Sequence, residues 1–160
     1  LGILIVTMLA FVPSCKDDSP SGPDTGITAQ NARTSECGGF APSAKPAASD
    51  TSSTETLSWR YDAASKTLAF TNSHVSLNCC GKHSIDAFLD GSTIVISESD
   101  EPSENGRCKC ICTFDFAIDV SGTFEQKTTV RLQRTVDDSV TVNKQFEINL
   151  STISGSVVIQ

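Results

Sequence analysis

The sequence lacks an excess of positive charge, a hydrophobic run long enough to cross a bilayer, and any stretch of sustained helical periodicity. Its 160 residues carry a net charge of −7, which offers no electrostatic footprint for phosphate backbones, so we expect no nucleic-acid partner. The apolar run LGILIVTMLAFV has 12 residues, whereas a transmembrane helix needs about 20. The length suits a single domain with some unstructured segments.

The N-terminal run instead matches the apolar core of a signal peptide. It leads into VPSC, residues 12–15, which resembles a bacterial lipobox, where the cysteine receives the lipid and becomes the mature N-terminus. The following Lys16, Asp17 and Asp18 resemble the signal that sends lipoproteins of the Bacteroidota to the outer face of the outer membrane. We therefore expect a partial lipoprotein signal peptide at 1–14, lipid on Cys15, and a lipid anchor in the outer membrane facing the cell surface.

The alternative is a cleaved secretory peptide followed by an incidental cysteine. Either interpretation takes the chain out of the cytoplasm into a compartment that permits disulfides. After Cys15 the composition shifts to Ser, Thr, Pro, Ala, Gly and Asp, which cannot bury enough apolar surface to offset the entropy of ordering. Residues 15–55 are therefore expected to be the lipidated cysteine and a flexible tether, in which Cys37 is the residue that does not fit.

Residues 56–160 show the two-residue period of β-strands. Cysteine, aromatic and aliphatic residues occupy seven consecutive alternate positions from Cys108 to Val120, and Asp90-Gly91 separates two alternating runs as a hairpin turn would. A change of phase near Asn72 indicates a β-bulge. The pattern predicts an all-β domain, an antiparallel two-sheet β-sandwich of immunoglobulin-like type.

The chain has seven cysteines, so six remain if Cys15 carries lipid. Alternate residues of a strand lie about 6.6 Å apart, too far for the roughly 3.5 to 4.5 Å between the Cβ atoms of a disulfide. The cysteines of CKCIC therefore cannot pair with one another in a regular strand. We predict three bridges, each joining one cysteine of CKCIC to one of the other three, with the individual pairing left open. The candidates are Cys37, Cys79, Cys80, Cys108, Cys110 and Cys112.

Metal binding is the alternative for these cysteines, because His83 in CCGKH completes a sulfur-rich set suited to Zn²⁺ or Cu(I). Structural zinc sites usually have two residues between paired cysteines, a spacing absent here, so no cofactor is expected. Redox catalysis is also disfavoured, because thiol oxidoreductases usually carry CxxC at a helix N-terminus. The alternative metal ligands are Cys79, Cys80, His83, Cys108, Cys110 and Cys112.

The remaining charged residues and the histidines are expected to lie at the surface and to have no catalytic or metal-binding role. The acidic stretch from Ser97 to Asn105 is expected to be a solvated loop, because its spacing fits no calcium loop. Basic side chains near residue 130 are expected on a wet face or a charged edge. No recognised catalytic arrangement surrounds either histidine, so we expect a non-enzymatic protein. These residues are Lys127, Arg131 and Arg134 for the basic set, and His74 and His83 for the histidines.

Four segments together, LSWRYD, NCC, ISESDE and CKCICTFDF, resemble a family of uncharacterised lipoproteins from the Bacteroidota. The resemblance covers roughly residues 57–150 and implies a shared fold and an exported location, with no activity attached. The sequence thus predicts an exported, lipid-anchored, disulfide-stabilised module that binds a protein or glycan partner without catalysis. A metal-binding lipoprotein is the alternative function.

Overall fold

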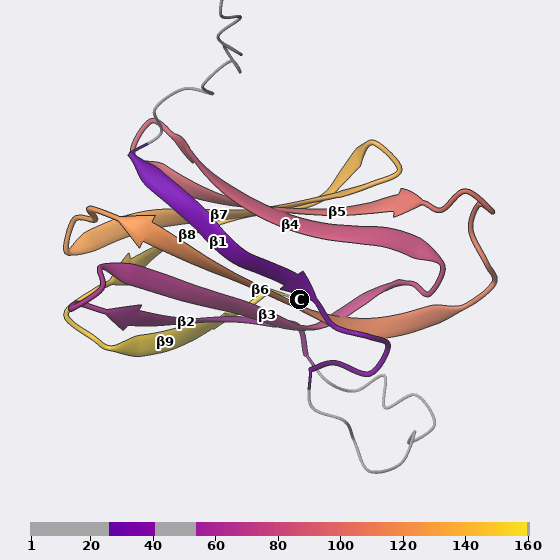
Figure 1. Ribbon diagram of the computed structural model, residues 1–160, viewed down its shortest axis with the longest axis horizontal. Helices are drawn as coiled ribbons and strands as arrows, with labels where there is room; N and C mark the ends of the chain where they lie inside the picture. Colours follow the sequence, from indigo (N-terminus) through magenta and orange to yellow (C-terminus); the bar gives the residue numbers. More distant parts are fainter. Residues whose placement is uncertain (1–25, 41–53, 160) are drawn as a thin grey trace, which may run out of the picture.

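The computed structural model describes residues 26–40 and 54–159, which form nine β-strands in two facing sheets (Figure 1). This confirms the predicted all-β sandwich. Within the described ranges, no helix is long and apolar enough to cross a membrane. The strands are β1 (Ile27–Thr34), β2 (Thr56–Asp62), β3 (Thr67–Asn78), β4 (Gly81–Asp90), β5 (Thr93–Pro102), β6 (Ile111–Gly122), β7 (Lys127–Val136), β8 (Ser139–Asn149) and β9 (Ser154–Val158).

The five-stranded sheet has the order β1-β6-β3-β2-β9, and the four-stranded sheet has the order β4-β5-β7-β8. One pair, β5 and β7, is parallel, so the expectation of wholly antiparallel sheets is wrong at this point. After β5 the chain crosses to the other sheet as β6 and then returns as β7, which gives β5 and β7 the same direction. Side-chain alternation reports which face is buried, not strand direction.

Strand β1 lies inside residues 15–55, which were expected to be a flexible tether. The expectation that the folded domain starts at residue 56 is therefore wrong. It pairs antiparallel with β6 from Ile27 opposite Gly122 to Thr34 opposite Phe116. As an edge strand it packs only Ile27 and Ala29 partly against the core, so its composition stays polar. The expected signal peptide at 1–14, Cys15, and the tether residues 16–25 and 41–53 lie outside the described residues.

The core lies between the sheets and consists of the alternate positions that the sequence pattern identified. Asn72 and Val75 flank a register shift between β3 and β6, which confirms the bulge. Asp90-Gly91 connects β4 to β5, with Gly91 at a φ of 62°. Wholly buried side chains include Leu57, Leu68, Phe70, Phe116, Ile118 and Leu132.

Candidate functional site

All six cysteines of the described residues form disulfides. The bonds are Cys37–Cys112, Cys79–Cys110 and Cys80–Cys108, with Cα separations of 5.7, 5.5 and 5.7 Å. Each cysteine of CKCIC thus takes one partner from the other three, as expected. The expectation of one regular strand from Cys108 onward is wrong, because β6 begins at Ile111. The preceding residues belong to the connection that carries the chain between the sheets.

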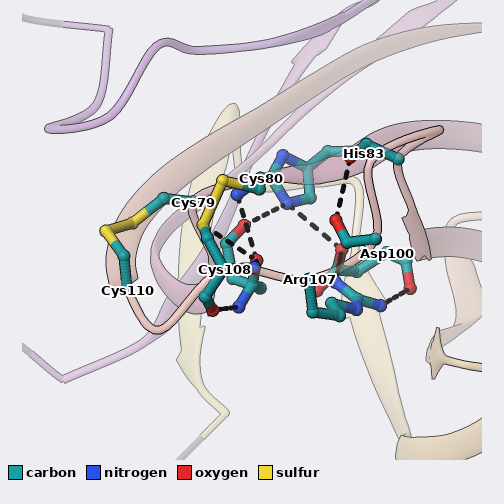
Figure 2. The surroundings of a disulfide bond; sticks show 10 residues. Cys79, Cys80, His83, Asp100, Arg107, Cys108 and Cys110 are labelled. Carbon is teal, nitrogen blue, oxygen red and sulfur yellow. Dashed lines mark hydrogen bonds and ion pairs between the residues drawn. A yellow bond between two sulfur atoms is a disulfide. The ribbon is translucent and has the colours of Figure 1, made fainter.

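Two disulfides link the two crossovers to each other (Figure 2). Both crossovers lie at the same end of the sandwich, where β3 and β5 end and β4 and β6 begin. Cys79 and Cys80 form the turn between β3 in one sheet and β4 in the other. Cys108 and Cys110 lie in the crossover between β5 and β6. We call these four cysteines, with Asn78, the disulfide corner.

The hydrogen bonds of Asn78 account for the asparagine that precedes the two cysteines in NCC. Its Nδ2 donates to the Cys108 carbonyl at 2.7 Å, and its Oδ1 accepts from the Cys80 and Cys108 backbone N–H groups at 3.0 and 3.3 Å. The Cys79 N–H donates to the Cys110 carbonyl at 3.1 Å. Hydrogen bonds of the Asn78 side chain, together with the backbone bond between Cys79 and Cys110, therefore hold the two crossovers in register. The disulfides add covalent links at the same place.

The third bridge holds the segment after β1 along β6. The Gly38 N–H donates to the Thr113 carbonyl at 2.9 Å, beside the Cys37–Cys112 bond. The Asp115 carboxylate accepts from the backbone N–H of Phe40 and of His74, both at 3.0 Å. Asp115 therefore anchors both this segment and the bulge of β3, where His74 has a φ of 64°.

His83 is built into the disulfide corner as a structural group. Its side chain is 7% exposed, and its ring lies 4.2 Å from that of Phe114 between centroids. Its Nε2 lies 3.1 Å from the Asn78 carbonyl oxygen and 3.3 Å from Asp100 Oδ1. A backbone carbonyl can only accept, so Nε2 carries the hydrogen.

Asp100 continues this network to Arg107 on the β5–β6 crossover. The Arg107 guanidinium donates to Asp100 Oδ1, to the Asp100 carbonyl and to Asp137 Oδ1. The hydrogen bonds that Arg107 donates to Asp137 and then to Asp100 raise the pKa of Arg107 above its ordinary value. Gly81 is required beside them, because a Cβ there would lie 1.9 Å from Asp100 Oδ1.

A second polar group, which we call the core cluster, consists of Glu55, Asn72, Glu98 and Arg134. The expectation of a solvated acidic loop is wrong for Ser97 to Pro102, which belong to β5. Glu98 is wholly buried, and Arg134 is 4% exposed. Arg134 does not lie on a wet face or a charged edge, because β7 is an interior strand of its sheet. Lys127 is exposed, as expected.

Sequence alternation could have located this cluster. Glu98 and Asp100 continue the even positions of Ile94 and Ile96, just as Arg134 continues the run through Leu132. The charge of these residues predicts exposure to solvent, whereas their place in the period of two predicts burial. The period is the better indicator here, because a buried charge is acceptable when its partners lie across the core.

The core cluster is densely hydrogen-bonded. Arg134 donates from Nε and Nη2 to Glu98 Oε2 at 2.8 and 2.6 Å, and from Nη1 and Nη2 to Glu55 Oε2 and Oε1 at 3.0 and 2.5 Å. Asn72 Nδ2 donates to Oε1 of both glutamates, at 2.9 Å for Glu55 and 2.8 Å for Glu98. Burial raises the pKa of Glu98, against the lowering effects of Arg134 and Asn72.

The alternative metal site loses its thiol ligands in this structure, because the sulfurs of its five cysteines are in disulfide bonds. In the described part of the chain, no group of three or more His, Cys, Asp or Glu side chains is arranged to hold a metal ion.

No family model, curated protein or solved structure matches the chain. The fold and the site therefore define it by class, as a two-sheet β-sandwich whose crossovers are joined by disulfides at one end.

Proposed function

We propose that this protein is an exported, lipid-anchored β-sandwich that serves as a non-catalytic binding or accessory module at the outer membrane. The observation that carries the proposal is the use of all six described cysteines in three disulfides. Disulfides persist in oxidising compartments and are rare in the cytoplasm. The lipobox-like VPSC and the resemblance to uncharacterised lipoproteins support the same location.

The surroundings of His83 support a non-catalytic role. Its Nε2 is committed to Asn78 and Asp100, and its ring is packed on Phe114. The His83 side chain is only 7% exposed, so a substrate in solution has little access to the ring, whereas a general base must lie within hydrogen-bond reach of the proton that it removes. The buried polar groups of the disulfide corner thus position the crossovers, and the outer faces of the sheets are the surfaces for a protein or glycan partner.

Metabolic labelling with a radioactive fatty acid tests the anchor. The protein, expressed with its leader in a bacterium that makes lipoproteins, should incorporate label and partition into detergent. Cys15→Ala should abolish both. Incorporation of label by the Cys15→Ala variant, or none by the wild type, would reject lipidation at this residue.

Intact-mass measurement with thiol alkylation tests the compartment. Protein taken from the cell envelope and alkylated before reduction should gain no label on its six described cysteines, and after reduction it should gain six. Free thiols in the envelope sample, together with stoichiometric zinc or copper by elemental analysis, would instead establish the metal-binding alternative. Purification without a metal affinity column is the necessary precaution.

A further inference from the structure

The core cluster joins the two sheets through the middle of the sandwich. Asn72 lies on β3 of the five-stranded sheet, and Glu55 immediately precedes β2 of the same sheet. Glu98 on β5 and Arg134 on β7 belong to the four-stranded sheet. All four side chains are enclosed, with residue exposures of 6, 0, 0 and 4%. Whatever charge the cluster carries is therefore held away from water.

The cluster has more acid than base. Two carboxylates face one guanidinium, so full ionisation leaves one excess negative charge. Like charges in one enclosed site disfavour ionisation of both groups, and a buried charge without compensation costs several kcal/mol. The site is thus one positive charge short of neutrality.

The surrounding strands supply no second cation to the glutamates. Lys144 on β8, two residues beyond Val142, donates its ammonium to the Val158 and Ile159 carbonyls at 2.6 and 3.2 Å rather than to a carboxylate. Among the described residues, the ion pairs of Glu55 and Glu98 are with Arg134 alone. In register, Ile85 on β4 pairs with Glu98, Phe116 on β6 pairs with Asn72, and Val142 on β8 pairs with Arg134. Two residues away on β4 and β5, the ionisable residues His83 and Asp100 pair with each other. There the Arg107 guanidinium already pairs with Asp100.

The hydrogen-bond inventory shows the same shortage. With both glutamates ionised, all four of their oxygens and Asn72 Oδ1 can only accept. Asn72 Oδ1 is buried without a donor among the described residues. Glu98 Oε1 accepts only from the neutral Asn72 amide, whereas each of the other three carboxylate oxygens accepts from Arg134.

We propose that the core cluster is a proton-binding site, which holds one proton on the Glu55–Glu98 pair at neutral pH, located on Glu98 Oε1. The proton neutralises the excess charge at the oxygen that the guanidinium does not reach. Because the cluster spans both sheets, binding of this proton is coupled to their packing. The sandwich takes up the proton on folding and releases it on unfolding.

Proton release on unfolding tests this directly. Oxidised protein is unfolded at pH 7 in two buffers of different ionisation enthalpy, and calorimetry gives the number of protons released. Wild type should release about one proton more than Glu98→Gln, because a glutamate in the unfolded chain is ionised at this pH. Glu147→Gln, which removes an exposed carboxylate paired with Lys127, is the matched control and should release as many protons as wild type.

Infrared spectroscopy gives an independent result that does not require the variant to fold. Folded wild type at pH 7 should show the carbonyl band of a protonated carboxyl group, and this band should vanish on unfolding. Equal proton release by wild type and Glu98→Gln would overturn the proposal. Absence of the carboxyl band from folded wild type would overturn it as well, because both glutamates would then be ionised.

Discussion

Among single side chains, Arg134 has the largest expected effect on stability, because its guanidinium serves two buried carboxylates at once. Arg134→Met keeps most of the apolar volume and leaves Glu55 and Glu98 without a cation. We expect the free energy of unfolding to fall by about 3 to 5 kcal/mol, the usual effect of removing one partner of a buried ion pair. Urea unfolding followed by circular dichroism measures the change.

Arg131→Met is the matched control on the same strand. The Arg131 side chain is 26% exposed and pairs with Asp90 at the surface, so its loss should lower the free energy of unfolding by less than about 1 kcal/mol. If both variants unfolded at the same urea concentration, the core cluster would contribute no more than a surface pair.

Gly155 allows the single tryptophan to lie across β9. A Cβ at position 155 would approach Trp59 Cζ2 to 2.2 Å, and the indole also stacks on Phe146 of β8, with ring centroids 6.5 Å apart. Gly155→Ala should therefore displace the ring and lower the free energy of unfolding by about 1 to 3 kcal/mol. Tryptophan fluorescence should change at the same time, since the chain has one Trp.

Ser156→Ala tests whether β9 itself tolerates alanine. Position 156 faces away from Trp59 on the same strand, and a surface substitution of this kind should change the free energy of unfolding by less than about 0.5 kcal/mol. A destabilisation equal to that of Gly155→Ala would locate the effect in the edge strand rather than in the indole contact.

Between elements, the two bridges of the disulfide corner are expected to act as a pair. They span sequence separations of 31 and 28 residues and close nearly the same loop. On the chain-entropy model, removal of either one leaves the loop closed and costs about 2 kcal/mol, whereas removal of the second opens it and costs about 3 to 4 kcal/mol more. The order of removal should not matter.

Paired serine substitutions measure this coupling. Cys79→Ser with Cys110→Ser removes one bridge, Cys80→Ser with Cys108→Ser removes the other, and the fourfold variant removes both. Urea unfolding of the three proteins and wild type completes the cycle. Additive losses would contradict the expectation, because each bridge would then stabilise a different part of the structure.

The sequence predicted the elements better than their connections. Alternation located the strands from Leu57 onward, and the phase change near Asn72 located the bulge. Strand β1 was missed because an edge strand with two partly buried residues resembles a tether in composition. The parallel pairing of β5 and β7 was missed because alternation is the same for either strand direction.

The sequence predicted which cysteines form disulfides, but not which cysteine pairs with which. Counting the cysteines identified the six partners, because Cys15 was set aside for lipid. Which cysteine pairs with which depends on where the chain crosses between sheets. Those crossovers place Cys79 and Cys80 opposite Cys110 and Cys108, and they are a property of the whole topology. The core cluster was not predicted, because charged residues at the buried positions of the alternation, such as Glu98 and Arg134, were expected at the surface. The contact between Glu55 and Arg134, 79 positions apart, also depends on the whole topology.

For the whole molecule, the two sheets are joined by three kinds of contact at different places. Apolar side chains fill the interior, the core cluster bridges it with hydrogen-bonded charges, and the disulfide corner links the crossovers at one end. Disulfides and apolar packing do not titrate, whereas the core cluster does. The pH dependence of global stability is therefore expected to report on this cluster more than on the rest of the fold.

The pKa of Glu98 is raised by burial, so its contribution to stability is fully present below the ordinary glutamate pKa and is lost as pH rises through the raised value. The free energy of unfolding of wild type should therefore fall with increasing pH across that window. Asp62 acts in the opposite sense, because hydrogen bonds from Ser65 and Ala64 lower its pKa. Its contribution is present above the ordinary aspartate pKa and is lost on acidification.

Urea unfolding of wild type and Glu98→Gln over a series of pH values separates the two carboxylates. The variant should lose the decline on the alkaline side, because glutamine does not titrate, and should keep the loss of stability in acid that Asp62 contributes. Asp62→Asn should do the reverse. Parallel curves for wild type and Glu98→Gln would mean that Glu98 has the same protonation state in the folded and unfolded chain, and the packing of the two sheets would then be independent of the proton.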